Sequence, residues 1–487
     1  MPLSRWPSSL ARTLTRGAIW FFVLIRTSQL FAQTSPVSPD HPWHSSREQD
    51  IERDAKALRS YQFSIDPAKT YSLAEFIDLA EVHNPQTRLA WERARSQAAA
   101  LGIARSELYP TLVAVALSQL NRAEILFGTT FWSQTVESLQ TSMELNYAVL
   151  DFGARSGRIN AARAEVLAAN FGFNDTHRNV IYQVEQAYYR LLNAKGQEDA
   201  ARASLANAQA VQEAAEDRLN HGLATLPDVL EARSATAQAE YELQSVLGAE
   251  EIARGDLATV LGTAPSAVIR VRPLDQLSIP ESISDSVDQA IDRALTQRPD
   301  LMQQVAAIRS ANARVKEARA AFYPALNLNA VPGGQLLYGS QQALPWIHTG
   351  AFAGGISLGL SWTVFDGGAR RSYLARAQAN ARAAQAEAGV SHDQIADQVW
   401  TAYSNLHTAF RQRQAATALL AAANQSYAAA LESYNYGLRS LLDVTQAQRT
   451  LAEARSTDVL ARTQVLGALA DLAFRTGDSI QSGAPKP

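Results

Sequence analysis

The stretch YAVLDFGAR at residues 147–155 decides the fold, because it returns as WTVFDGGAR at residues 362–370. The two copies lie 362 − 147 = 215 residues apart. The same offset persists far downstream, where Gly262 matches Gly477. An internal repeat of this length indicates that the chain is one duplicated unit.

Each copy has the same order of features. An alternating stretch ends at an Asp-x-Gly turn, and a long Ala-rich segment, a Gly-centred hairpin and a second helical segment follow. Upstream signatures repeat at an offset of 214, namely Asn84-Pro85 and Tyr109-Pro110 against Arg298-Pro299 and Tyr323-Pro324. We therefore expect a first repeat at 71–262, a linker at 263–285 and a second repeat at 286–477.

The N-terminal residues 1–32 have the features of a secretory signal peptide: three arginines, then an apolar run at 18–25, then a small residue at the expected cleavage point. A membrane anchor would need about 20 apolar residues, and Arg26 ends the run well short of that. We expect an exported chain with no other transmembrane helix, a loosely ordered lead-in at 33–70 and a disordered tail at 478–487.

Two short helices are expected at the start of each repeat. Ser72 with Glu75 three residues later is a capping-box pattern. The helix should stop near Asn84, because a residue before proline disfavours helical geometry. A second helix should run to about Leu108, and the second repeat has the same pattern from Ser286.

Four segments alternate apolar and polar residues, which predicts strands with one apolar face. We expect them at about 111–119, 139–149, 325–331 and 356–365, with exposed loops at 119–138 and 332–354. A soluble β-sandwich would show the same alternation. In an exported chain, lengths near the about 9–11 residues of a membrane-spanning strand favour a membrane barrel.

Four strands are too few to close a barrel, since about eight is the minimum. An open edge in lipid would leave backbone groups unpaired, at several kcal/mol each. Membrane placement therefore predicts an oligomer, and three chains would supply twelve strands.

The segment from Ala154 to about His221 contains no proline and predicts one helix of roughly 100 Å at about 1.5 Å per residue. Its apolar seam steps alternately by four and three residues, as in a coiled coil. The second copy shows the same seam from Ile395 to Tyr434. Taken alone, this pattern is equally typical of a rod-like coiled coil without a pore.

Composition narrows the function. The chain has no cysteine, a formal net charge of −3 and no basic block, so we expect neither thiol chemistry nor a nucleic-acid partner. Its eight histidines lack metal-site spacing, and the glycines at 153 and 367–368 belong to turns and not to phosphate loops. We expect no enzyme activity, cofactor or metal, which leaves a membrane duct or a structural periplasmic coiled coil.

The repeat, the Asn-Pro and Tyr-Pro signatures, the Asp-x-Gly strand ends and the Tyr-x-x-Gly…Asp-Val hairpin together resemble the TolC family of outer membrane efflux proteins, over about residues 70–477. The resemblance implies an α+β, mainly α, homotrimer: a twelve-stranded β-barrel in the outer membrane continued by a twelve-helix periplasmic barrel, with the linker at its equator. It also implies a periplasmic adaptor protein and an inner-membrane pump of RND, ABC or MFS type as partners.

The same resemblance implies roles at the hairpin tips. Glycine after a helix is usually a left-handed cap, and the resemblance adds contact with the adaptor, through Gly222, Leu223, Gly437 and Leu438.

The periplasmic entrance is the second implied site. The resemblance gives Asp443 a place in a cation-favouring ring, and has Tyr434 and Arg439 hold the Asp228 region of a neighbouring hairpin. The simpler reading of both aspartates is a first-turn acid that offsets the helix dipole. Gln446 stands where some relatives have a second acidic ring.

Overall fold

The computed structural model describes residue 40 and residues 48–57, 63–280, 286–341 and 344–478. The chain divides into two units, residues 1–62 and 63–487. The described part of the first unit is mainly helix α2, Glu48–Ala57, which buries no side chain. The expected signal peptide, much of the lead-in and residues 479–487 of the tail lie outside the described residues.

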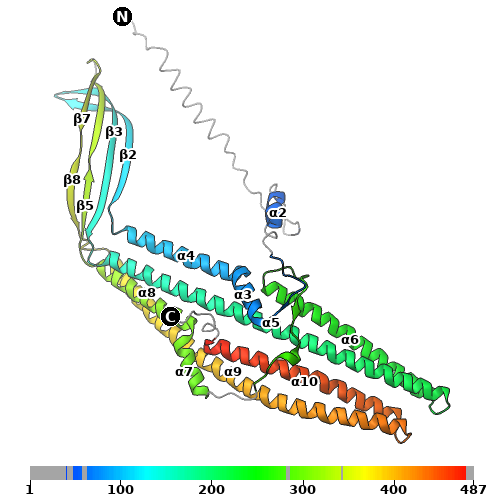
Figure 1. Ribbon diagram of the computed structural model, residues 1–487. Coiled ribbons are helices and arrows are strands. Elements are labelled where there is room, and N and C mark those ends of the chain that lie inside the picture. Colours follow the sequence, from blue (N-terminus) through cyan, green and yellow to red (C-terminus); the bar gives the residue numbers. More distant parts are fainter. Residues whose placement is uncertain (1–39, 41–47, 58–62, 281–285, 342–343, 479–487) are drawn as a thin grey trace. The chain divides into compact units, whose positions relative to one another are not determined.

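The second unit runs through one order of elements twice (Figure 1). The first repeat contains β1 Thr70–Tyr71, α3 Leu73–His83, α4 Pro85–Ser106, β2 Thr111–Phe127, β3 Thr130–Leu150, α5 Ala154–Asn220 and α6 Leu226–Val260. The linker holds β4 Arg270–Val271 and the 3-10 turn η2 Leu274–Gln276. The second repeat contains α7 Val287–Gln297, α8 Pro299–Ala320, β5 Ala325–Val331, β6 Gly333–Gln341, β7 Ile347–Phe352, β8 Gly355–Ser361, α9 Ala369–Asn435 and α10 Leu441–Thr476.

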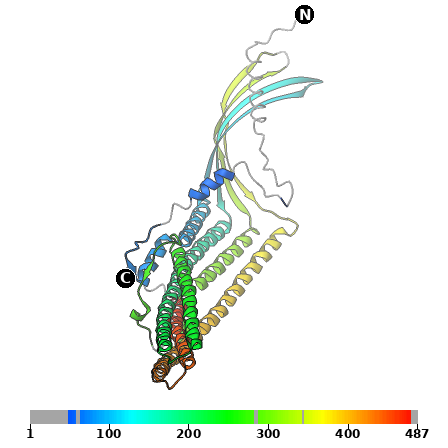
Figure 2. The same ribbon diagram turned by 90° about the vertical axis from the view of Figure 1, so that its right-hand side faces the viewer.

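In this unit the sheet lies at one end of the long helices, and the α5–α6 and α9–α10 hairpins end at the other (Figure 1). Helix α5 packs against α4, α6, α8 and α10, and α9 packs against α8 and α10. Helices α4, α5, α8 and α9 thus form a wall one helix thick beneath a curled sheet (Figure 2). Among the described residues, no helix is long and apolar enough to span a bilayer.

The repeated Asp-x-Gly stretch turns each strand into a long helix. Gly153 and Gly368 adopt φ values of 100° and 89°, a left-handed conformation that glycine tolerates best. The Asp151 carboxylate accepts hydrogen bonds from the backbone N–H of Gly153 (3.1 Å) and of Arg155 (2.7 Å). Asp366 does the same in the second copy. A carboxylate therefore satisfies free amide groups at the start of both α5 and α9.

Strands β2 and β3 are longer than predicted, and the loops expected at 119–138 and 332–354 are mostly strand. Strand β5 has the expected bounds, whereas β8 ends at Ser361, before the expected end at residue 365. Every residue of β2 pairs with β3, and a tight turn at Gly128 connects the two strands. Strands β5 and β6 continue one another across Pro332 along β3, and β7 and β8 together pair with β5 and β6. The sheet is effectively four long strands, because Pro332 interrupts the pairing without ending it.

The register sorts the sheet into two faces, since directly paired residues share a face. One, which we call the apolar face, carries Leu112, Leu139, Met143, Leu145, Leu326, Leu328, Leu336, Ile356, Leu358 and Leu360. The other, the polar face, carries Gln140, Ser142, Glu144, Asn146, Asn327, Asn329 and Ser357.

Strand β2 departs from the face that alternation alone suggested. Its larger side chains, Val113, Val115 and Leu117, pair with Glu144, Ser142 and Gln140, and so lie on the polar face. On β2 the apolar face is built from Leu112 and small alanines. Alternation in one strand does not fix which side faces lipid; the pairing register does.

The apolar face has the height of a membrane. On β3 it runs from Leu139 to Leu150, about 37 Å at about 3.4 Å per residue, and a strand tilt of about 40° reduces this to about 28 Å. Aromatic residues flank it: Tyr338 stacks on His348 at 5.5 Å beyond the outer end, and Phe152 stacks on Tyr323 at 5.3 Å near the helices. An apolar band of about 25 Å between aromatic girdles is typical of outer-membrane strands.

The long helices pack through the expected seam. Val180, Val184, Ala187 and Leu191 of α5 are buried, and so are the matching Ile395, Val399, Ala402 and Leu406 of α9. Ala208 and Ala215 continue the first seam towards the tip. Small alanines at these positions let the helices approach closely over most of their length.

In each repeat, the residue between the two short helices makes a hydrogen bond to the end of a long helical hairpin. Asn84 caps α4 and donates through Nδ2 to the carbonyl of Val260, in the last turn of α6 (2.8 Å). The matching Arg298 is buried and ion-paired to Asp300 at 2.6 Å. It also donates to the carbonyl of Arg475 near the end of α10 (3.5 Å). The two repeats thus use different residues for the same connection.

The lead-in and the linker meet midway along the helices. Strand β1 pairs in parallel with β4. The Thr263 hydroxyl donates to the carbonyl of Phe63 (2.7 Å). Side chains from both segments, such as Ile65 and Val271, share one core with Phe76 and Tyr188. This small subdomain is built from two distant stretches of sequence.

Candidate gate at the hairpin tips

Both hairpin tips are built by the same helix-ending motif. Gly222 adopts φ +71°, its N–H bonds to the carbonyl of Leu219 (2.9 Å), and the N–H of Leu223 bonds to that of Arg218 (2.7 Å). This pair of bonds, a Schellman motif, requires a left-handed residue, and glycine provides it without strain. Gly437 and Leu438 repeat the motif in the second hairpin.

The tips present apolar side chains to solvent. Leu223 is 68% exposed and Leu438 is 78% exposed. Neither belongs to the cluster that holds the hairpins together. The glycines therefore have a geometric role, and the leucines are available for contact with another molecule.

The two aspartates cap the helices that return from the tips. Asp228 accepts hydrogen bonds from the backbone N–H (2.9 Å) and the hydroxyl (2.7 Å) of Thr225. Asp443 accepts the same two bonds from Ser440, at 3.1 and 2.9 Å. These bonds lower the pKa of each aspartate, with a smaller contribution from Arg218 for Asp228 and from Arg439 for Asp443. Both groups therefore carry a full negative charge at neutral pH while stabilising α6 and α10.

Tyr434 sits between the two hairpins. It is buried in a cluster that includes Val211 and Val229 of the first hairpin and Leu441 of the second. Its hydroxyl is buried without a hydrogen-bond partner among the described residues. Burial raises the pKa of this phenol. A buried unpaired hydroxyl costs about 1–3 kcal/mol, so this group lowers the stability of the closed packing between the hairpins.

Arg218 joins the hairpins and was not found from the sequence. Its guanidinium donates through Nη1 to the carbonyls of Tyr434 (2.9 Å) and Asn435 (3.2 Å) and stacks over the Tyr434 ring at 4.7 Å. The available signal was a break in the repeat: Arg218 and Leu219 stand where the second copy has Ser433 and Tyr434. The two tips are complementary where they differ.

Arg439 is exposed at the second tip. Within the described residues of the single chain, no hydrogen bond or ion pair connects Tyr434 or Arg439 with Asp228. The resemblance implies this contact with a neighbouring hairpin, and it stays a prediction.

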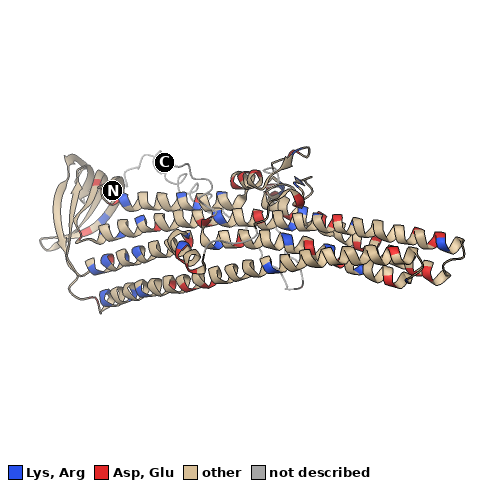
Figure 3. Ribbon diagram, turned by 60° about the horizontal axis from the view of Figure 1, so that its bottom comes forward, with Lys and Arg blue, Asp and Glu red and all other residues tan. Residues whose placement is uncertain are grey.

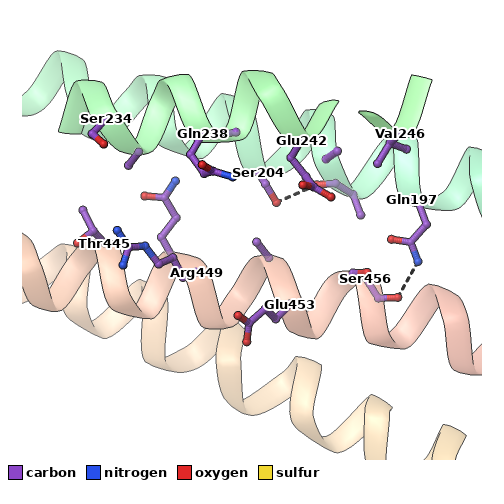
Figure 4. A pocket seen from close by; sticks show the side chains of 16 residues that line it. Gln197, Ser204, Ser234, Gln238, Glu242, Val246, Thr445, Arg449, Glu453 and Ser456 are labelled. Atoms are coloured by element: carbon purple, nitrogen blue, oxygen red, sulfur yellow. Dashed lines mark hydrogen bonds between the residues drawn. The ribbon is translucent and has the colours of Figure 1, made fainter. Parts of the chain in front are cut away.

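Above the tips the hairpins separate around a polar groove of about 630 Å³ (Figure 4). Gln238 and Glu242 of α6 face Arg449 and Glu453 of α10 across it. At the sheet-side end of the groove, Gln197 donates to the carbonyl of Ser456 (2.9 Å). The hairpins are thus joined through Gln197 at the sheet-side end, through Arg449 of α10 and Glu231 of α6 (3.3 Å), and through Arg218 at the tips.

A curled sheet with a membrane-high apolar face, continued by helices of about 100 Å, defines an outer membrane channel of the tunnel type. The family model for outer membrane efflux proteins matches residues 76–263 and 290–478, once for each repeat. The chain belongs to the outer membrane efflux protein family.

Comparison with individual proteins gives the same family. The chain is 29% identical to protein CyaE of Bordetella pertussis, over 85% of this chain and 86% of that protein. It is 27% identical to outer membrane protein OprJ of Pseudomonas aeruginosa, over 84% and 85%. A membrane protein of P. aeruginosa superposes with TM-score 0.74 at 24% identity, over 91% and 96%. The outer membrane protein VceC of Vibrio cholerae gives 0.69 at 20%, over 83% and 96%. The chain is accordingly an outer membrane efflux channel protein that extends into the periplasm.

Proposed function

We propose that this protein is the passive exit duct for substrates expelled by an inner-membrane pump, that it works as a homotrimer, and that its periplasmic end is held closed at the hairpin tips. The free edges support the trimer. Among the described residues, strand β2 and the β7–β8 strand each leave one edge unpaired, and such edges in lipid cost several kcal/mol per group. Three chains joined edge to edge would satisfy them.

The contacts at the hairpin tips are the observation that supports a closed periplasmic end. Arg218 fixes the two hairpins of one chain together at Tyr434, and the exposed Arg439 stands at the second tip. We assign Tyr434 and Arg439 to contact with the Asp228 region of a neighbouring chain. An exposed ion pair is worth only about 0–1 kcal/mol. Repeated three times, such contacts favour a closed state that a partner protein could reverse.

The partner surface follows from the same tips. Exposed Leu223 and Leu438 beside the two Schellman turns form a small apolar contact on each hairpin. We assign them to a periplasmic adaptor, which would couple the duct to a pump of RND, ABC or MFS type. No catalytic role is proposed, since passive conduction needs none.

The test is the double variant Tyr434→Phe with Arg439→Ser in planar bilayers. We expect a higher single-channel conductance than the wild type. A matched control makes the same two substitutions away from the tip, at exposed Tyr241 and at Arg254, and should leave the conductance unchanged. Unchanged conductance in the tip variant, with assembly intact, would mean that other residues close the entrance.

A further inference from the structure

Positive charge is concentrated where the helices meet the sheet (Figure 3). Residues 309–325 contain four basic residues and one acid, and residues 362–382 contain four basic residues and one acid. The whole chain has a net charge of −3. This end of the helical wall therefore differs in charge from the rest of the protein.

The acid of the first of these stretches, Glu317, lies on one side of the wall. Glu317 lines a cavity of about 990 Å³ between α5, α8 and α9, together with Asp151 and Glu165. The cavity also reaches Ala325 and Ser361, which pair with each other on the polar face of the sheet. The cavity side of the helical wall is therefore continuous with the polar face.

On the cavity side, three of the four arginines that line the cavity are paired with acids, and the fourth, Arg376, lies over the Tyr373 ring at 5.1 Å. Arg158 pairs with Glu317 at 3.5 Å, and Arg314 pairs with Glu165. Arg370 pairs with Asp366 at 2.8 Å at the start of α9.

Three basic residues point the other way. In a helix a step of two residues turns about 200°, so a residue two positions from a cavity-lining one faces the opposite side. Arg314, Ala321 and Tyr373 line the cavity. Lys316, Arg319 and Arg371 lie two positions away from these residues, in the same order. We call Lys316, Arg319 and Arg371 the basic collar.

The collar is exposed and makes no ion pair with any described residue. Lys316 lies about 6 Å and Arg319 about 2 Å before the last residue of α8, and Arg371 lies about 3 Å after the first residue of α9, at about 1.5 Å per residue. The collar therefore lies on the outer side of the wall, directly below the apolar face.

We infer that the basic collar binds the anionic phosphate headgroups of phospholipids in the periplasmic leaflet of the outer membrane. Headgroups occupy several Å on each side of the hydrocarbon core, which is the level of these side chains. Lysine and arginine next to an acidic lipid surface each contribute about 1 kcal/mol of attraction. The collar would fix the depth of the sheet in the membrane and resist tilting of the helical wall. The inference rests on the membrane placement of the sheet, not on the gate.

The test compares a collar variant, Lys316→Gln with Arg319→Gln and Arg371→Gln, with the wild type. Phosphatidylglycerol or phosphatidylcholine is titrated into the protein in neutral detergent, and bound lipid is counted by native mass spectrometry. Phosphatidylglycerol affinity should fall about fivefold for each charge removed, the factor that about 1 kcal/mol gives. Phosphatidylcholine binding should not change, and free inorganic phosphate should not compete at equal concentration.

The matched control is Arg163→Gln with Arg309→Gln and Arg382→Gln. These residues are also exposed and two positions from cavity-lining residues, but they lie about 14–20 Å from the helix ends. They should bind phosphatidylglycerol as the wild type does. Full binding by the collar variant, or an equal loss in the control, overturns the inference. Conductance measured on the same collar variant should equal that of the wild type, which separates this result from any failure of the duct.

Discussion

Substitution of Arg218 by glutamine should open the periplasmic end, because Arg218 fixes the two hairpins of a chain to each other at the tips. Its guanidinium makes two hydrogen bonds to carbonyls, at 2.9 and 3.2 Å, and stacks on Tyr434. A hydrogen bond with a charged partner contributes about 1.5–3 kcal/mol, and an exposed cation–π contact about 0.5–1 kcal/mol. Because Arg218 is only half-buried, we expect a loss of about 2 kcal/mol per chain.

A loss of about 2 kcal/mol changes the ratio of open to closed hairpin pairs about 30-fold. Single-channel recording should then show larger or longer-lived openings for Arg218→Gln than for the wild type. Arg218→Lys should be intermediate, since an ammonium keeps the charge and can donate hydrogen bonds but lacks the planar guanidinium that stacks on the Tyr434 ring.

The control is Arg233→Gln, which removes an exposed arginine that pairs with Glu216 at 2.9 Å near the same tip. Such a pair contributes about 0–1 kcal/mol, so conductance should barely change. If Arg218→Gln assembles normally and conducts like the wild type, the contact between hairpins does not hold the entrance, and the reasoning is refuted.

Three further predictions concern the sheet, the entrance and the helical core. Leu358→Arg should destabilise the folded sheet by about 2–4 kcal/mol if Leu358 lies near the bilayer midplane, and the heat-modifiable folded fraction on a gel should fall. Ser357→Arg, on the polar face, should be tolerated. Equal tolerance of the two variants would mean that the assigned faces are wrong. Asp443→Ala should reduce cation preference in reversal-potential measurements, and Ser440→Ala, which removes cap bonds but keeps the carboxylate, should not; equal selectivity in both would remove Asp443 from the pore. Burial raises the pKa of Glu185 to about 7. The folded state therefore holds a proton that the unfolded chain releases near pH 4.5. The free energy of unfolding should fall by up to about 3 kcal/mol as the pH rises from about 4.5 to 7. Glu185→Gln should remove most of that fall in the thermal midpoint between pH 5 and 8, and an unchanged pH dependence would contradict the assignment.

The helices could be predicted because their signals are local. Ser72 and Glu75 form the expected capping box. The Asp-x-Gly turns begin both long helices, and the four-three seam is buried. Each of these features depends on residues within a few positions of one another, and the repeat shows each of them twice.

The strands could be predicted only in part, because register and length depend on pairing with distant residues. Residues 119–124 are mostly polar and carry no alternation, yet they continue the ladder because β3 provides partners throughout. Val113 and Glu144 share a face that neither strand reveals alone. At the tips, Arg218 was missed because it lies where the repeat fails, and its partner carbonyls have no sequence signature.

Cysteine cross-linking tests most directly whether contacts between neighbouring chains close the periplasmic entrance. The chain permits this experiment because it contains no cysteine of its own. The variant carries Asp228→Cys and Arg439→Cys and is oxidised in intact membranes. We expect disulfide-linked trimers on a non-reducing gel, and a conductance in bilayers that rises when the disulfides are reduced. Cross-linked species no larger than the monomer, or oxidised trimers that conduct as freely as reduced ones, would contradict a trimeric duct closed by its hairpin tips.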